Sequence, residues 1–173
     1  MKITFIGGGN MATAIINGLI HQGYNATQIC VVEINAESRA RIKTDLGVSV
    51  TSDLASGVAN CDVVMLAVKP QQLFDLTQQL TFLLEEQLII SIAAGIRATD
   101  IKRWLGNYER VIRAMPNTPS LVRAGVTGLY AAPNANEQDK KTAESILSAV
   151  GDVLWLDEEE MLHAVTAISG SGP

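Results

Sequence analysis

Residues 3–14 read ITFIGGGNMATA, and this stretch decides the fold class of the chain. The apolar run Ile3 to Ile6 leads directly into the glycines Gly7 to Gly9, and a pattern typical of a helix then continues to about Gln22. The order predicts a strand, a tight glycine turn and the beginning of a helix. The spacing Gly7-x-Gly9-x-x-Ala12 is the dinucleotide-binding fingerprint, with alanine in its last position.

Each fingerprint position has a physical role. Gly7 is expected to make the tight turn, Gly9 to let the backbone approach a pyrophosphate because it has no Cβ, and Ala12 to let the helix lie close to its strand. The free N–H groups and the dipole at the helix start would then face the phosphates. The alternative is a flexible glycine turn without a ligand, and the flanking strand and helix argue against it.

The composition is that of a globular protein with one good-sized domain and a short extension. Of the 173 residues 47% are hydrophobic, which is enough for a core. The net charge is −5 without a basic stripe, so we expect neither nucleic acid nor an anionic membrane surface as a partner. The longest apolar runs are strand-sized and no leader precedes the first strand, so we expect a cytoplasmic protein without a membrane span.

Neither the cysteines nor the histidines suggest a metal site. Cys30 and Cys61 lie at apolar, strand-like positions without a CxxC motif, and we expect both to be small buried side chains. His21 and His163 have no partner at the spacing of metal ligands. We therefore expect no bound metal.

The rest of the chain alternates strand-like and helix-like segments. Strands are predicted at residues 2–6, 29–33, 47–50, 61–68, 87–92, 110–114, 126–131 and 152–156, and helices at about 10–22, 35–45, 71–84, 98–105, 136–149 and 157–168, with a short helix capped by Ser52 or Asp53. This alternation predicts a Rossmann-type, doubly wound α/β fold, which is a mostly parallel sheet with helices on both faces. The clearest strand is CDVVMLAV at 61–68, because a parallel strand covered on both faces is a near-continuous apolar run.

Four strand exits are expected to form a ligand track. In a parallel sheet, ligands bind outside the carboxyl ends of the strands. The predicted exits are Gly7–Gly9, Ala67–Pro70, Ile92–Gly95 and Pro116–Thr118, and each contains small residues or proline. Each exit alone is ordinary loop sequence. Together at one edge, they would leave room for a flat ring and a ribose.

The second strand ends in Glu33, 21 residues after Ala12. An acidic side chain at this distance from the fingerprint accepts hydrogen bonds from the adenosine ribose hydroxyls. The alternative is a solvated carboxylate at a strand end.

Five motifs carry a resemblance to a known family. They are FIGGGNMATAI, LAVKPQ, ISIAAGI, RAMPNTPSLVRAG and ISGSGP, in this order. They closely resemble pyrroline-5-carboxylate reductase over essentially the whole chain, and RAMPNTP and SGSGP are far more specific than the glycine fingerprint. That family reduces the cyclic imine 1-pyrroline-5-carboxylate to L-proline with NADPH or NADH, in the last step of proline biosynthesis. The resemblance implies this activity, substrate and cofactor.

The resemblance also assigns residues to the cofactor. It implies pyrophosphate contacts at Ile6, Gly7, Gly8, Gly9, Asn10 and Met11, a ribose-proximal Glu33, a stretch beside the cofactor at Ala67, Val68, Lys69 and Pro70, and a nicotinamide-proximal stretch at Ile92, Ala93 and Ala94. Asn117 and Thr118 are expected near the reacting end. Family members often have a small polar residue in place of Glu33. A carboxylate there repels a 2′-phosphate, which argues against the usual preference for NADPH.

The resemblance further implies a division of the chain. The family has a helical domain after SGSGP that makes the dimer and supplies much of the substrate pocket. We therefore expect residues 1–156 to form the NAD(P)-binding domain and 157–173 to begin the helical domain of a homo-oligomer. Met161, Leu162, Val165 and Ile168 would form its first apolar stripe. Residues 1–173 alone are then expected to reduce the imine poorly.

The residues do not identify the acid that protonates the imine. Lys69 is the nearest candidate, but a lysine before proline at a strand end is more often solvated or directed at a phosphate. Solvent, the substrate or a residue beyond Pro173 are the other possibilities. Two further functions stay open: another Rossmann dehydrogenase acting on a 2-hydroxy acid or a deazaflavin, and a dinucleotide-sensing module without chemistry. RAMPNTP argues against the first, and a helical domain following Pro173 would argue against the second.

Overall fold

The structure, a computed structural model, describes residues 1–117 and 123–163. Its strands are β1 (Ile3–Ile6), β2 (Ile29–Val32), β3 (Ser49–Thr51), β4 (Val63–Leu66), β5 (Leu88–Ser91), β6 (Val111–Met115), β7 (Gly125–Ala131) and β8 (Gly151–Trp155). Its helices are α1 (Asn10–His21), α2 (Ala36–Leu46), α3 (Leu54–Val58), α4 (Pro70–Leu80), α5 (Ala98–Trp104) and α6 (Glu137–Leu147), with the short 3-10 helices η1 (Ala26–Gln28) and η3 (Ser148–Val150).

Every predicted strand and every predicted helix up to residue 149 is present, within a few residues of its expected ends. The largest difference is in α4, which ends at Leu80 and leaves Leu83 outside the predicted helix. Asp53, rather than Ser52, caps α3 by accepting a hydrogen bond from the N–H of Ser56. The predicted helix at 157–168 is described only as far as Met161–His163, and the rest of it lies outside the described residues.

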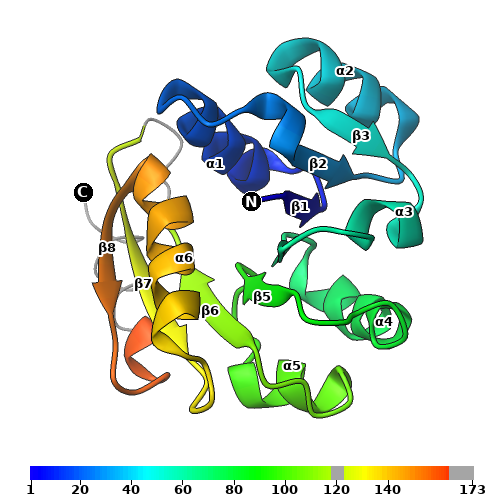
Figure 1. Cartoon of the computed structure of the whole chain (residues 1–173). Coiled ribbons are helices and arrows are strands. Elements are labelled where there is room, and N and C mark those ends of the chain that lie inside the picture. The colour runs from blue at the N-terminus through cyan, green and yellow to red at the C-terminus, as the bar shows by residue number, and fades with distance from the viewer. Residues whose placement is uncertain (118–122, 164–173) are drawn as a thin grey trace.

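The eight strands form one sheet in the order β3-β2-β1-β4-β5-β6-β7-β8 (Figure 1). The first six in this order are parallel, as a doubly wound α/β fold requires. β7 runs antiparallel to β6, and β8 is parallel to β7. The sequence analysis did not predict this reversal. Its physical reason is the connection 116–124, which is too short for the helical crossover that a parallel neighbour of β6 needs.

Two apolar cores cover the two faces of the sheet. On one face α1, α2, α6 and η3 pack around Phe5, Ile15 and Ile90. On the other face α4 and α5 pack around Leu66, Leu73 and Ile101. All four residues of β4 are buried, as predicted for a strand covered on both faces. The sheet is therefore a rigid centre, and its strand ends are the free positions for a ligand.

The cysteines follow the prediction in part. Cys61 is buried, whereas Cys30 is half-buried. Burial raises the pKa of both thiols, so both stay protonated. They therefore pack as small, weakly polar side chains. Over 1–117 and 123–163, no three His, Cys, Asp or Glu side chains are arranged to hold a metal ion. Within the same ranges, no helix has the length and apolar character to cross a membrane.

A first prediction concerns the close packing of α1 on η3. A Cβ at Gly18 would lie 2.4 Å from the carbonyl oxygen of Ala149. We expect Gly18→Ala to lower the free energy of unfolding by about 1–3 kcal/mol, because the backbone of η3 must move. This cost exceeds the gain of about 1 kcal/mol in helix propensity. Urea unfolding measures the change.

The matched control is Asn17→Ala, which changes an exposed neighbour in the same helix. It should leave stability unchanged or raise it slightly, because only helix propensity changes. A Gly18→Ala protein as stable as Asn17→Ala would contradict the close contact.

Candidate cofactor site

The predicted strand exits lie next to one another at the carboxyl edge of the sheet. β1, β4, β5 and β6 are consecutive neighbours and all point the same way. The backbone N–H of Ala67 donates to the carbonyl of Ile6 at 2.9 Å, and that of Ile92 donates to Leu66 at 3.1 Å. The predicted adjacency is confirmed for the described residues of the exits, since the hydrogen-bond register fixes each exit beside the next.

Gly7 is required by the fold itself. Its φ is +101°, and a Cβ there would lie 2.7 Å from the carbonyl oxygen of Ala67. Any other residue would be strained and would push the exits of β1 and β4 apart. The turn predicted at this position is confirmed, and Ala12 is buried in the core between α1 and the sheet as expected.

The fold itself does not require glycine at position 9. Its backbone is extended, with φ −75° and ψ −172°, a conformation open to any residue. A Cβ built there would meet no atom within 4 Å. The missing side chain therefore leaves open space in front of α1. That space is what close approach of a pyrophosphate needs, so the residues present fit a dinucleotide.

The N-terminus of α1 also lacks a side-chain cap. Its N-cap is Gly9, and its first turn has no acidic residue. By contrast, Asn35, Asp53 and Asn136 cap α2, α3 and α6 with their own side-chain oxygens. The first intrahelical bond of α1 runs from Thr13 N–H to Gly9, so the N–H groups before Thr13 have no carbonyl within the helix. An anion is the natural acceptor for them.

Glu33 lies beside this glycine turn. One carboxylate oxygen accepts the N–H of Gly8 at 3.2 Å, and the other accepts the N–H of Asn35 at 3.1 Å. A Cβ at Gly8 would collide with Ile42 of α2 at 2.3 Å, so the turn is pressed against this helix. The carboxylate is thus held at the junction of β1 and β2, where an adenosine ribose would lie.

Arg39 brings a positive charge to the same strand end. Its guanidinium donates to the carbonyl oxygens of Glu33 at 2.8 Å and Ile34 at 2.9 Å. Ile34 itself is 82% exposed. The end of β2 therefore holds a carboxylate suited to ribose hydroxyls and a cation suited to a phosphate.

The other expected cofactor residues follow β4 and β5 at the same edge. Ala67, Val68 and Ile92 are half-buried, Ala93 is buried, and Lys69, Pro70 and Ala94 are exposed. Pro70 is the first residue of α4, where its missing N–H costs nothing. Lys69 precedes it with its side chain in solvent, consistent with a solvated or phosphate-facing charge rather than a buried acid.

Asn117 has a structural role that the sequence analysis did not foresee. Its side-chain oxygen accepts the N–H of Val126 at 3.0 Å, which ties the exit of β6 to the start of β7. Thr118, the other residue expected near the reacting end, lies outside the described residues.

The sequence analysis did not identify the buried ion pair between Arg113 and Glu159. Arg113, within the RAMPNTP motif, is fully buried and donates to Glu159 at 2.9 Å. The available signal was an arginine in the middle of the otherwise apolar strand VIRAM, since such a charge is buried only with a partner. No sequence spacing identified Glu159 as that partner.

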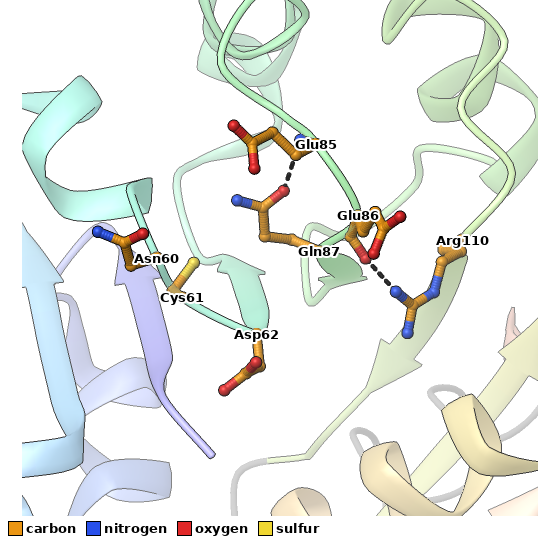
Figure 2. Close-up of a pocket in the computed structure, with 7 residues that line it drawn as sticks. All are labelled: Asn60, Cys61, Asp62, Glu85, Glu86, Gln87 and Arg110. Carbon is orange, nitrogen blue, oxygen red and sulfur yellow. Dashed lines mark hydrogen bonds between the residues drawn. The ribbon is translucent and has the colours of Figure 1, made fainter.

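A hollow of about 630 Å³ lies at the opposite edge of the sheet (Figure 2). It is lined by Asn60, Cys61, Asp62, Glu85, Glu86, Gln87 and Arg110, which precede β4, β5 and β6. Arg110 already pairs with Asp139 and with the carbonyl of Glu86, and Gln87 donates to Val58. This hollow is polar and lies at the amino ends of the strands. The carboxyl edge is the better candidate site.

Comparison with known proteins identifies the family of the chain. The family model described as NADP oxidoreductase coenzyme F420-dependent matches residues 2–95. A pyrroline-5-carboxylate reductase of Pseudomonas aeruginosa is 48% identical over 173 residues, covering 99% of this chain and 63% of the relative. The chain thus spans less than two thirds of the length of this relative.

Two solved structures extend the comparison to three dimensions. A pyrroline-5-carboxylate reductase of Coxiella burnetii has a TM-score of 0.95 and 46% identity, covering 99% of this chain and 64% of that one. A Plasmodium falciparum pyrroline carboxylate reductase with NADP bound has a TM-score of 0.88 and 26% identity, covering 100% and 63%. The Rossmann-type fold predicted from the sequence is confirmed. The resemblance that the motifs carry is confirmed too, and the chain belongs to the family described as NADP oxidoreductase coenzyme F420-dependent.

Proposed function

We propose that this chain binds NADPH or NADH along the carboxyl edge of β2 to β6 and serves as the cofactor half of a pyrroline-5-carboxylate reductase. The product would be L-proline. The proposed reaction rests on one observation. The 48% identity to a pyrroline-5-carboxylate reductase extends through the whole chain, including RAMPNTP. The open space at Gly9 and the uncapped α1 support the cofactor.

The chain's own residues would bind and orient the cofactor. The N–H groups at the start of α1 hold the pyrophosphate, and Glu33 accepts hydrogen bonds from the adenosine ribose. The other half of the cofactor then extends past Ala67 toward the exits of β5 and β6. When bound, a reduced nicotinamide supplies the hydride that the imine carbon accepts. The small residues Ala93 and Ala94 leave room for the ring.

The reduction also needs a proton, which does not come with the hydride. The imine nitrogen takes one proton as its carbon takes the hydride, which gives a secondary amine. Among the described residues at the edge, Lys69 is the only basic side chain that the motifs placed beside the cofactor, and it is exposed. We therefore propose solvent, the substrate or a residue beyond Pro173 as the acid, with Lys69 facing a phosphate.

A second candidate is a dehydrogenase that uses a deazaflavin. It is favoured by the description of the matched family model, which names coenzyme F420. That match covers residues 2–95 and so leaves out RAMPNTP and the last strands. The relatives named pyrroline-5-carboxylate reductase cover 99% of the chain, which favours the imine. A dinucleotide-sensing module is the third candidate.

The domain division is also a proposal. We propose that residues 157–173 begin a helical domain that makes the dimer and completes the substrate pocket. The relatives, about 63% of whose length this chain spans, are long enough to hold such a domain. Met161 is 47% exposed and Leu162 is buried, so the first turn of the proposed stripe already presents one apolar side chain to solvent. Val165 and Ile168 lie outside the described residues.

Steady-state oxidation of NADPH and NADH with 1-pyrroline-5-carboxylate tests the function. The longest natural chain should oxidise either cofactor only when the imine is present. Activity with reduced F420 and none with nicotinamides would favour the second candidate. Tight NADPH binding without turnover by that chain would favour the sensor.

The Gly9 prediction tests cofactor placement. Gly9→Val should leave the sheet folded, because nothing lies within 4 Å of the added Cβ and the backbone is extended. It should weaken NADPH binding at least about a hundredfold, because the side chain fills the pyrophosphate position. Fluorescence titration measures the affinity, and circular dichroism the fold. A folded variant with near-normal affinity would show that the pyrophosphate lies elsewhere.

The Glu33 prediction tests coenzyme choice. With Glu33 in place, NADH should bind at least as well as NADPH. Glu33→Ser should shift the ratio of affinities toward NADPH by about 1–2 kcal/mol, because a like charge near the 2′-phosphate is removed. Arg39→Ala in the same background should reverse the shift if Arg39 meets that phosphate. An unchanged ratio in Glu33→Ser would place the carboxylate away from the ribose.

A further prediction concerns the proposed domain division. Residues 1–173 should bind NADPH as tightly as the longer natural chain and reduce the imine far more slowly at saturating cofactor. The reason is that the proposed cofactor contacts all lie within residues 1–173, whereas the proposed helical domain would supply much of the substrate pocket. Equal turnover by the two chains would place the substrate pocket within 1–173.

A further inference from the structure

A buried carboxylate joins three segments that are far apart in the sequence. Glu159 follows β8, and its side chain is 8% exposed. One of its oxygens accepts a hydrogen bond from the guanidinium of Arg113, on β6, at 2.9 Å. The same oxygen accepts the backbone N–H of Ala98, the first residue of α5, at 2.5 Å. One atom therefore connects β6, α5 and the segment after β8.

The contact with Ala98 makes Glu159 the cap of α5. The residue at the N-cap position is Arg97, whose side chain makes no capping bond. A carboxylate at a helix start satisfies a free N–H and meets the positive end of the dipole. The start of α5 is thus fixed by a residue sixty-one positions later in the chain.

Both segments held by Glu159 continue from the candidate site. α5 begins at Ala98, soon after the exit Ile92–Gly95 of β5, and β6 ends at Met115 and leads into Pro116 and Asn117. These are the two exits farthest from Glu33 along the edge of described parallel strands. If the adenosine half lies at β2 and the pyrophosphate at α1, the nicotinamide half must extend toward them.

The ion pair has little other support within the described residues. Arg113 is 0% exposed, and its Nε and Nη2 have no hydrogen-bond partner in those ranges. Burying a charged pair costs desolvation, and apolar replacements are often as stable. A geometric role explains this pair better than stability does. The neighbouring pair Arg97–Glu160 differs, because its side chains are 53% and 61% exposed.

We propose that Glu159 is a positioning residue for the nicotinamide half of the cofactor. Through Arg113 and Ala98 it holds the exits of β5 and β6 at a fixed separation. The adenosine half, at β1 and β2, does not depend on it. The inference rests on the proposed dinucleotide function, and it adds a residue outside the glycine turn and the strand exits to the binding machinery.

The test compares whole and half ligands. NADPH carries both halves, whereas 2′-phospho-ADP-ribose lacks the nicotinamide. Calorimetric titration gives the affinity of each for the 173-residue chain. Glu159→Gln should weaken NADPH about tenfold while leaving 2′-phospho-ADP-ribose within about twofold, because only one half of the site loses its geometry. A general loss of stability would weaken both ligands together.

Two further variants make the test decisive. Glu160→Gln breaks the exposed neighbouring pair and should leave both affinities as in the wild type. The double variant Arg113→Met with Glu159→Gln removes both buried charges, so it should fold even if the single variant does not, and it should show the same selective loss. Thermal melting followed by circular dichroism reports the fold of each.

The outcomes separate the two proposals. Selective loss of NADPH affinity in Glu159→Gln or in the double variant supports the positioning role. Equal loss of both ligands, no loss of either, or the same selective loss in Glu160→Gln overturns it. Wild-type chain that binds neither of these ligands and does not bind NADH would refute the dinucleotide proposal itself and the positioning role with it.

Discussion

The distance between Gly7 and Ala67 sets the geometry on which the rest of the site depends. With only a hydrogen in place of a side chain, the turn after β1 lies against the backbone after β4. α1 can then begin directly at the carboxyl edge, with its free N–H groups facing the open space at Gly9. A side chain at Gly7 would push the exits of these two strands apart. The parallel ladder from β2 to β6 extends this contact into a continuous edge.

The two ends of this edge are held by different means. At β2, Arg39 donates to the carbonyl of Glu33, six positions before it, and the Glu33 carboxylate accepts the N–H of Gly8 in the adjacent glycine turn. At β5 and β6, the exits are held by Glu159 from a distant part of the chain. In our proposal, coenzyme choice depends on this one strand end. Nicotinamide placement, in our proposal, depends on the assembly of the whole sheet.

The reversed strand β7 is what makes this long-range contact possible. It returns along β6, and β8 adds beside it through the crossover of α6. The chain that leaves β8 consequently reaches α5 and the buried Arg113. Asn117 strengthens the same corner by bonding Val126 across the connection between β6 and β7. A sheet with β7 parallel to β6 would bring the end of β8 elsewhere.

The sequence by itself determined the elements, the fold class and the four exits, because apolar periodicity, glycine and proline act over a few residues. It also identified Gly7 and Gly9, although only the coordinates show that Gly7 is required by packing and Gly9 is not. The reversal of β7, the choice of Asp53 as a cap, the bond of Glu33 to Gly8 and the pair Arg113–Glu159 were decided by the tertiary structure. Most of these depend on which distant segments meet, and local sequence patterns carry no information about such pairings.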